Sequence, residues 1–128
     1  MNTLSNIKNF SIGADIEDIE RFRSFNYKKD KKLLDKILTK NELDYCFSKE
    51  HPSHHLAARF VGKEAILKAL AGLEKFDLSH KEIEIINNKK GVPEVKLNKK
   101  NTSKLKINLS LSHCQDKAIA FAVVVEFK

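Results

Sequence analysis

The sequence predicts a single α+β domain in which an antiparallel sheet packs against one long helix. A strand pattern opens the chain, helical spacing of apolar residues dominates residues 39–70, and alternating patterns return from residue 83 onwards. At 128 residues, with 41% of them apolar, the chain is long enough to close one hydrophobic core. A second domain is not expected.

The first strand is expected over residues 7–15, because apolar side chains alternate with others from Phe10 to Ala14. Gly13 permits the tight approach of another segment just before Asp15. We therefore expect Asp15 to lie at the end of this strand.

Helical spacing follows directly, since Ile16, Ile19 and Phe22 recur three residues apart. They predict a short helix. Its polar residues would be Glu17, Asp18 and Arg21. The lysine-rich residues 27–32 are expected to form a solvated link.

Two further helices are expected in the middle of the chain. Thr39 and Glu42 form a capping-box pattern, which should start a short helix that ends near His51. The longest helix should follow over residues 53–70, and Gly72 is placed to end it.

The second half of the chain changes to a period of two, which is typical of strands with one exposed face. Strands are expected around residues 83–85, 95–97 and 105–111, with a turn at residues 87–91. Residues 118–127 are apolar on both faces, as expected of a central strand or of one that a neighbouring subunit covers.

Composition limits the partners. Lys and Arg number 24 against 17 Asp and Glu, and the net charge of +7 favours an anionic partner, such as nucleic acid, phosphates or an acidic protein. No apolar run reaches the roughly 20 residues that a membrane span needs. The N-terminal segment lacks the pattern of a signal peptide, so we expect a cytoplasmic protein without membrane association.

Asp15 is the first candidate site residue. With the acidic Glu17 and Asp18 close behind, it could hold a hard cation, since magnesium prefers one or two carboxylates plus water and substrate oxygens. A solvated helix start with favourable acidic residues would explain the same pattern.

The long helix carries the second candidate. Glu64 and Lys68 are four residues apart and share a face. An exposed ion pair would explain this spacing, but both lie close to the direction of Phe60 and so border the apolar face. Gly62 and Lys63 do not begin a phosphate loop, because the required upstream glycine is missing and Glu64 replaces Ser or Thr.

The third candidate is at the end of the strand over residues 105–111. There His113, next to Ser112, could supply hydrogen-bond donors to a phosphate, although a histidine in a turn is more often solvated.

Together these segments resemble the signatures of the 4′-phosphopantetheinyl transferase superfamily, specifically its short holo-[acyl-carrier-protein] synthases. The segments are GADIEDIERF (residues 13–22), RFVGKEAILKA (59–69) and LSLSHCQDKAIAFAVV (109–124). Between the second and third segments, Gly91-Val92-Pro93 matches the Gly-x-Pro motif of the same family. The likeness covers nearly the whole chain.

The resemblance implies a 4′-phosphopantetheinyl transferase-like fold and a reaction. The 4′-phosphopantetheine group of coenzyme A would move to a serine of apo-acyl-carrier protein, releasing adenosine 3′,5′-bisphosphate, in support of fatty acid biosynthesis. Asp15 and Glu64 would bind Mg²⁺ at the pyrophosphate, and Glu64 and Lys68 would be catalytic, with Lys68 neutralising phosphate charge. The general base stays open between Glu64 acting through a water, another carboxylate and a metal-bound water.

The resemblance also implies binding residues and an assembly. Coenzyme A would be contacted by Arg59, Lys63, Lys68, Gly91, Pro93, Ser112 and His113. Lys63 projects about 100° from Glu64, toward solvent or the outer phosphate of the nucleotide. Arg21 would contact acidic side chains of the carrier protein. Relatives of this short type form homotrimers with the active site between subunits.

Two other functional classes fit parts of the sequence. A small basic nucleic-acid-binding module is favoured by the lysine surplus, but it would need aromatic stacking sites that we do not expect in the sheet, and the motif carboxylates oppose it. The other is a partner that binds the carrier protein without transferring anything.

Overall fold

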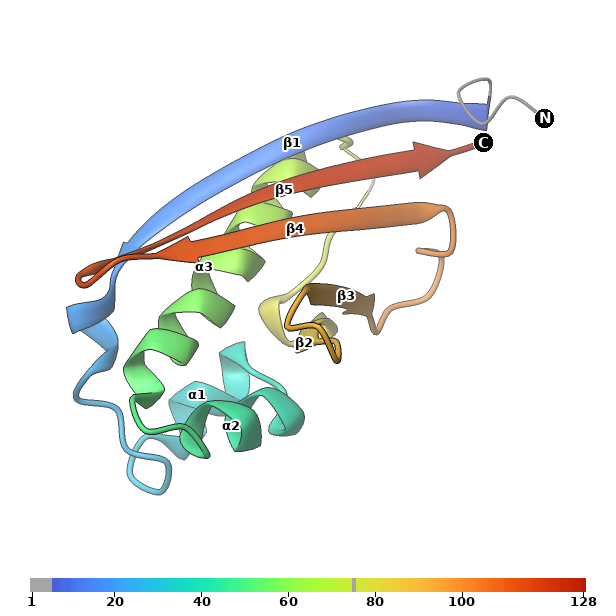
Figure 1. Ribbon diagram of the computed structural model, residues 1–128. Helices are drawn as coiled ribbons and strands as arrows, with labels where there is room; N and C mark the ends of the chain where they lie inside the picture. The colour runs from blue at the N-terminus through green and yellow to red at the C-terminus, as the bar shows by residue number, and fades with distance from the viewer. Residues whose placement is uncertain (1–5, 75) are drawn as a thin grey trace.

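The computed structural model describes residues 6–74 and 76–128 and confirms the α+β class (Figure 1). The prediction about the N-terminal segment falls partly on residues 1–5, outside this range. The elements in chain order are β1 (Ile7–Asp18), η2 (Ile19–Phe22), α1 (Lys31–Ile37), α2 (Lys40–Phe47), α3 (Pro52–Ala71), η3 (His80–Glu82), β2 (Ile83–Asn87), β3 (Pro93–Leu97), β4 (Leu105–His113) and β5 (Lys117–Phe127), where η marks a short 3₁₀ helix.

Strands β1, β5 and β4 form a three-stranded antiparallel sheet in that order, and β2 and β3 form a separate hairpin. The central place of β5 confirms one of the two expectations from its sequence, which is apolar on both faces. Figure 1 shows β1, β5 and β4 side by side, with the start of β1 and the end of β5 at the same end of the sheet.

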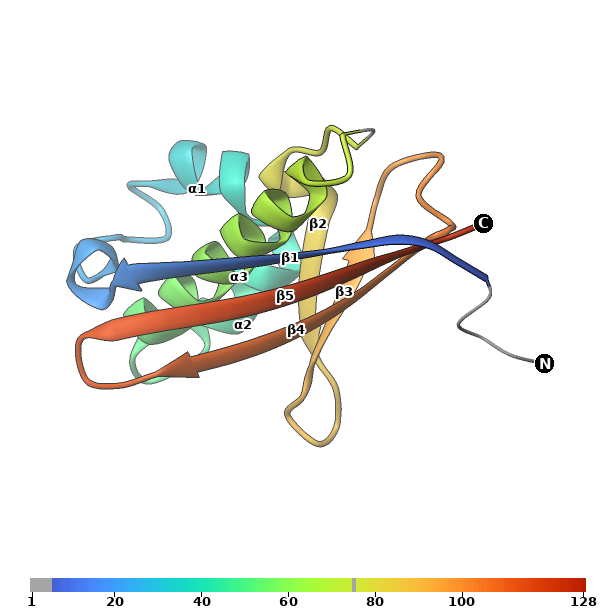
Figure 2. The same cartoon turned by 90° about the horizontal axis from the view of Figure 1, so that it is seen from above.

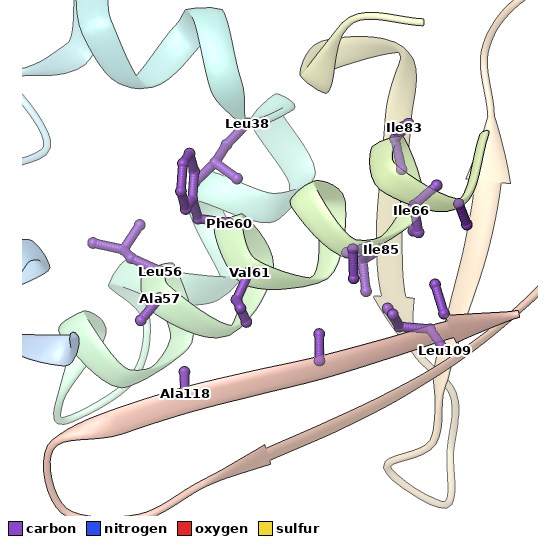
Figure 3. Close-up of a cluster of buried hydrophobic side chains, with 14 of the residues drawn as sticks. Leu38, Leu56, Ala57, Phe60, Val61, Ile66, Ile83, Ile85, Leu109 and Ala118 are labelled. Carbon is purple, nitrogen blue, oxygen red and sulfur yellow. The ribbon is translucent and has the colours of Figure 1, made fainter. Parts of the chain in front are cut away.

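Helix α3 lies along one face of this sheet and is enclosed on its other sides by α2, η2, η3 and β2 (Figure 2). Because it is covered from several directions, apolar side chains from most of its circumference enter the core. Figure 3 shows this core between α3, the sheet and the β2 strand. In the described part of the chain, no helix is both long and apolar enough to cross a membrane.

Strand β1 approaches the backbone of α3 at Gly13. A Cβ atom at this position would lie 2.1 Å from the carbonyl oxygen of Ala65 and 2.7 Å from the amide nitrogen of Ala69. Any side chain would therefore force the strand and the helix apart. The opposite residue on β5, Ala122, is buried on the same face of the sheet.

The end of β1 differs from the sequence prediction. The strand continues to Asp18, because residues 16–18 pair with residues 117–119 of β5. Asp15 therefore lies three residues before the strand end instead of at it, and the expected helix shrinks to η2. Pairing with β5 therefore determined the conformation of residues 16–18, although their apolar residues have helical spacing.

Helix α1 was not predicted. Only residues 27–30 of the expected solvated link form a turn, and the helix begins at Lys31 and buries Leu34. Its seven residues are mostly lysine and leucine, too few to show a clear helical period.

Helices α2 and α3 confirm the predicted helix starts, although α2 ends at Phe47, before the expected boundary near His51. The Thr39 hydroxyl accepts a hydrogen bond from the Glu42 backbone, and the Glu42 carboxylate accepts one from the Thr39 backbone, which is the expected capping box. Helix α3 begins at Pro52, and Gly72 caps its end.

Lys63 differs most from its prediction, because it points into the protein interior instead of toward solvent. Its side chain is fully buried, and its ammonium donates hydrogen bonds to Glu42 Oε1 at 2.5 Å, Ile37 O at 2.8 Å and His80 O at 2.9 Å. Burial lowers the pKa of Lys63, and the Glu42 carboxylate opposes this effect. All three donors of the ammonium are used inside the protein, so Lys63 is a structural residue here.

The outer face of the three-stranded sheet also differs from expectation, because it does carry exposed aromatic rings. The large apolar side chains exposed there are Phe10 (66%), Ile12 (73%), Ile16 (57%), Phe121 (58%) and Val123 (41%). Most neighbours of the two rings on β1 and β5 are aliphatic, whereas the β4 side of this face is polar and carries Ser110 beside Phe121 and one lysine, Lys106.

We expect Gly13→Ala to lower the free energy of unfolding by about 1–3 kcal/mol or more, because the added methyl group has no space against α3. Urea unfolding followed by circular dichroism would measure this. Gly91→Ala is the matched control, since its Cβ would meet nothing within 4 Å and only its positive φ of 80° opposes the change. Equal stability of the Gly13 variant and the unmodified protein would contradict the close approach.

We also expect Lys63→Met to destabilise the fold by about 3–5 kcal/mol, because it leaves the buried Glu42 carboxylate without its cation. Lys68→Met is the matched control, since Lys68 is on the same helix but half exposed. Chemical unfolding of both variants in parallel measures the difference. Similar small losses at the two positions would show that the buried pair contributes little.

Candidate active site

The structure brings Asp15 of β1 and Lys68 of α3 into contact. Lys68 Nζ lies 3.0 Å from Asp15 Oδ1 and donates a second hydrogen bond of 3.1 Å to the carbonyl oxygen of Ala14. Asp15 pairs with Ala120, whose side chain is buried against α3, so its carboxylate points to the helix. The Lys68 side chain is 56% exposed and that of Asp15 is 16% exposed, so the ammonium side of the pair is open to solvent.

Glu64 lies one helical turn before Lys68, but it has a different partner. Its Oε1 atom is 2.9 Å from His80 Nε2, and both side chains are 29% exposed. The exposed ion pair between Glu64 and Lys68 that the spacing allowed is therefore replaced by two pairings with other elements. These two pairings place the carboxylates of Asp15 and Glu64 and the ammonium of Lys68 along one side of α3.

This donor set fits a magnesium ion. Asp15 and Glu64 supply hard oxygen donors from β1 and α3, and Mg²⁺ commonly takes one or two carboxylates and completes its shell with water and phosphate oxygens. Among residues 6–74 and 76–128, no three His, Cys, Asp or Glu side chains gather into a cluster that could hold a metal. A cation at this place would therefore depend on oxygen atoms from a substrate.

His80 is a site residue that the sequence reasoning missed. Its ring stacks on that of Phe60 with the centroids 5.7 Å apart and the planes inclined by 5°. Ser79 and Glu82 form a capping box that starts η3 and places His80 at its first position. The Ser-x-x-Glu spacing was visible in the sequence and is the signal that marks this turn.

Arg21 also contacts the Phe60 ring. Its guanidinium carbon is 5.1 Å from the Phe60 ring centroid, and Nη1 is 3.1 Å from Glu17 Oε1. The side chain is 58% exposed. The aromatic ring and the carboxylate thus hold an accessible cation beside the candidate site.

Arg59 belongs to a second region, further toward the start of α3. It is buried, lines a cavity of about 190 Å³ with Tyr45 and Asn87, and lies with its guanidinium carbon 4.7 Å from the Tyr45 ring centroid. Within the described residues, Arg59 Nε has no hydrogen-bond partner. A buried guanidinium with an unused donor at a cavity is suited to an anionic group.

The predicted turn of Gly91 and Pro93 reaches the same region through the β2–β3 hairpin. Pro93 pairs with Asn87, which lines the Arg59 cavity. Gly91 adopts a positive φ of 80°, which glycine accommodates without strain, and closes the turn between the two strands.

Ser112 and His113 end β4, but they face opposite sides of the sheet. His113 pairs with the buried Ala118, and its ring centroid is 5.7 Å from that of His54 on α3. Ser112 pairs with Ile119 and therefore points to the outer face. The two side chains therefore lie on opposite faces of β4, and only His113 lies on the face that packs against α3.

Comparison with known families gives one match over most of the chain. The family model described as the 4′-phosphopantetheinyl transferase superfamily matches residues 11–122. This span includes each of the candidate residues from Asp15 to His113.

Relatives and solved structures are similar over nearly the same length. Holo-[acyl-carrier-protein] synthases of Thermodesulfovibrio yellowstonii and Geotalea daltonii are 42% and 39% identical, covering 88% and 90% of this chain and 96% and 97% of their own. The Helicobacter pylori enzyme in complex with coenzyme A is similar at 33% identity and a TM-score of 0.74, covering 88% of this chain and 98% of that one. The Bacillus anthracis enzyme in complex with CoA (3′,5′-ADP) is 29% identical with a TM-score of 0.72, covering 91% and 96%.

Proposed function

This chain belongs to the 4′-phosphopantetheinyl transferase superfamily, and we propose that it is a magnesium-dependent holo-[acyl-carrier-protein] synthase. It transfers the 4′-phosphopantetheine group of coenzyme A to a serine of apo-acyl-carrier protein in support of fatty acid biosynthesis. The observation that carries this function is the contact of 3.0 Å between Asp15 and Lys68, with Glu64 one turn away. Carboxylates and an ammonium so arranged suit a pyrophosphate with a bound cation.

Asp15 and Glu64 are the residues that would hold Mg²⁺. When bound, the ion would neutralise pyrophosphate charge and polarise the phosphorus under attack. Lys68 supplies a further positive charge, and its half-exposed ammonium can exchange the Asp15 carboxylate for a phosphate oxygen. Charge that develops on these oxygens during transfer is thereby stabilised by groups already in place.

The transfer is a single displacement at phosphorus. The acceptor serine oxygen forms a bond to the phosphorus that carries the pantetheine arm, and the bond from this phosphorus to the bridging oxygen breaks. Adenosine 3′,5′-bisphosphate leaves with that oxygen, and the serine proton passes to a general base. Glu64 acting through a water is one candidate for this base.

The nucleotide end of coenzyme A is assigned to the region around Arg59. Two observations support this assignment: Arg59 lines a cavity, and its buried Nε has no hydrogen-bond partner among the described residues. The Gly91 to Pro93 turn borders the cavity through Asn87. His113 contributes from the end of β4. The fully buried ammonium of Lys63 instead holds the helices in place.

A homotrimer is part of the proposal. The outer face of the three-stranded sheet exposes Phe10, Ile12 and Phe121, and large apolar patches of this kind mark sites of association. Contact with neighbouring subunits would cover these side chains, and it would bring the outward-facing Ser112 toward another chain.

Arg21 is proposed to contact the acyl-carrier protein. It is exposed, it lies beside the candidate site, and the surrounding chain has a net charge of +7. An acidic partner would therefore be attracted over a distance and oriented by the arginine.

To test the transfer, the protein is incubated with coenzyme A, magnesium and apo-carrier protein. The mass of the carrier protein is then measured by mass spectrometry. We expect the mass of the arm to appear, and Asp15→Asn and Glu64→Gln each to slow the transfer roughly 100-fold or more. Circular dichroism should show both variants folded. No mass gain with the unmodified protein would favour a non-catalytic carrier-binding role, and ordinary turnover of Glu64→Gln at low magnesium would refute the metal assignment.

The docking role is tested by Arg21→Glu at saturating magnesium. We expect the KM for carrier protein to rise roughly tenfold or more, because like charges then face each other, and the KM for coenzyme A to change far less. Added salt should weaken carrier binding of the unmodified protein through screening. Lys104→Glu makes the same charge change at an exposed position of the chain outside the site and should have little effect. An unchanged carrier KM in Arg21→Glu at low salt would place docking elsewhere.

A further inference from the structure

His80 is held from two sides by neighbouring residues of α3. Its backbone carbonyl oxygen accepts a hydrogen bond of 2.9 Å from the buried ammonium of Lys63. Its Nε2 atom lies 2.9 Å from the carboxylate of Glu64, the next residue along the helix. The capping box of η3 and the parallel stack on Phe60 fix the remaining freedom of the imidazole ring.

This arrangement determines which atom carries the proton. An ionised carboxylate only accepts hydrogen bonds, so His80 Nε2 must be the donor to Glu64 Oε1. The bond restricts the rotation of the Glu64 side chain, and it leaves the second carboxylate oxygen available to a ligand. Glu64 thus has one oxygen fixed by the protein.

We propose that His80 is a positioning residue that orients the Glu64 carboxylate for binding the metal ion. The inference rests on the proposed function, in which Glu64 is a magnesium ligand. Carboxylates that bind metals are commonly held by a hydrogen bond from a neighbouring group, and loss of such a partner typically lowers metal affinity about 10- to 100-fold. His80 acts through Glu64 and does not itself touch the substrate.

A purely structural role is the competing explanation, because the His80 ring also packs on Phe60. Three substitutions of His80 distinguish the positioning role from the structural role. His80→Phe keeps an aromatic ring and removes the donor. His80→Gln and His80→Met have similar length, but only glutamine carries a donor that can reach the carboxylate.

The experiment measures Mn²⁺ binding by electron paramagnetic resonance of the free ion, with each protein saturated with coenzyme A. We expect His80→Phe and His80→Met to weaken binding about 10-fold or more, and His80→Gln to recover most of the loss. The magnesium concentration for half-maximal transfer should rise in parallel, while the KM for carrier protein stays unchanged. Adding His80→Phe to Glu64→Gln should weaken binding little further, since the oriented carboxylate is already gone.

The outcomes distinguish this inference from the proposed function. If the unmodified protein transfers the arm but His80→Met and His80→Gln bind Mn²⁺ equally, the positioning role is wrong and the function stands. Equal loss in both variants together with a fall in melting temperature would also refute it and show a packing role. If the unmodified protein transfers no arm, the proposed function itself fails.

Discussion

The absence of a side chain at Gly13 is the constraint on which the site depends. Only a hydrogen atom fits between β1 and the backbone of α3, because a Cβ would lie 2.1 Å from the Ala65 carbonyl oxygen. This approach brings Asp15, two residues further along the same face of the strand, within 3.0 Å of Lys68 Nζ. A wider separation would leave the same charged residues in the molecule without joining them in one site.

The opposite side of α3 is fixed by a buried polar network. The Lys63 ammonium joins the end of α1, the capping carboxylate of α2 and the first residue of η3, through Ile37, Glu42 and His80. Glu42 also accepts a hydrogen bond from the backbone of Ile85. Three helical segments and the β2 strand are thereby held against the helix that carries Glu64, so the site is built on a rigid support.

Sequence patterns identified the parts of the molecule in which local rules and tertiary packing agree. The capping box of Thr39, the long helix, and the strands of the second half follow from such rules. The spacing of Asp15, Glu64 and Lys68 made them candidates, but their roles came from the family resemblance and stay predictions. The extension of β1 to Asp18 depended on pairing with β5, about a hundred residues away. The burial of Lys63 depended on α2 and η3, whose positions no helical periodicity specifies.

Lys63 and Lys68 show how environment assigns opposite roles to identical side chains on one helix. Lys63 is fully buried, and removing it would leave a carboxylate and two backbone carbonyls without their donor, so all its hydrogen bonds are used to hold the structure. The Lys68 side chain is 56% exposed and that of Asp15 is 16% exposed, so water can replace Asp15 as the partner of the ammonium, and the pair contributes less to stability than a fully buried one. The contact of Lys68 with Asp15 can therefore be exchanged for a phosphate at small cost. The same weakness that makes the Asp15–Lys68 pair a poor stabiliser makes it suitable for a site that must bind and release charged substrates.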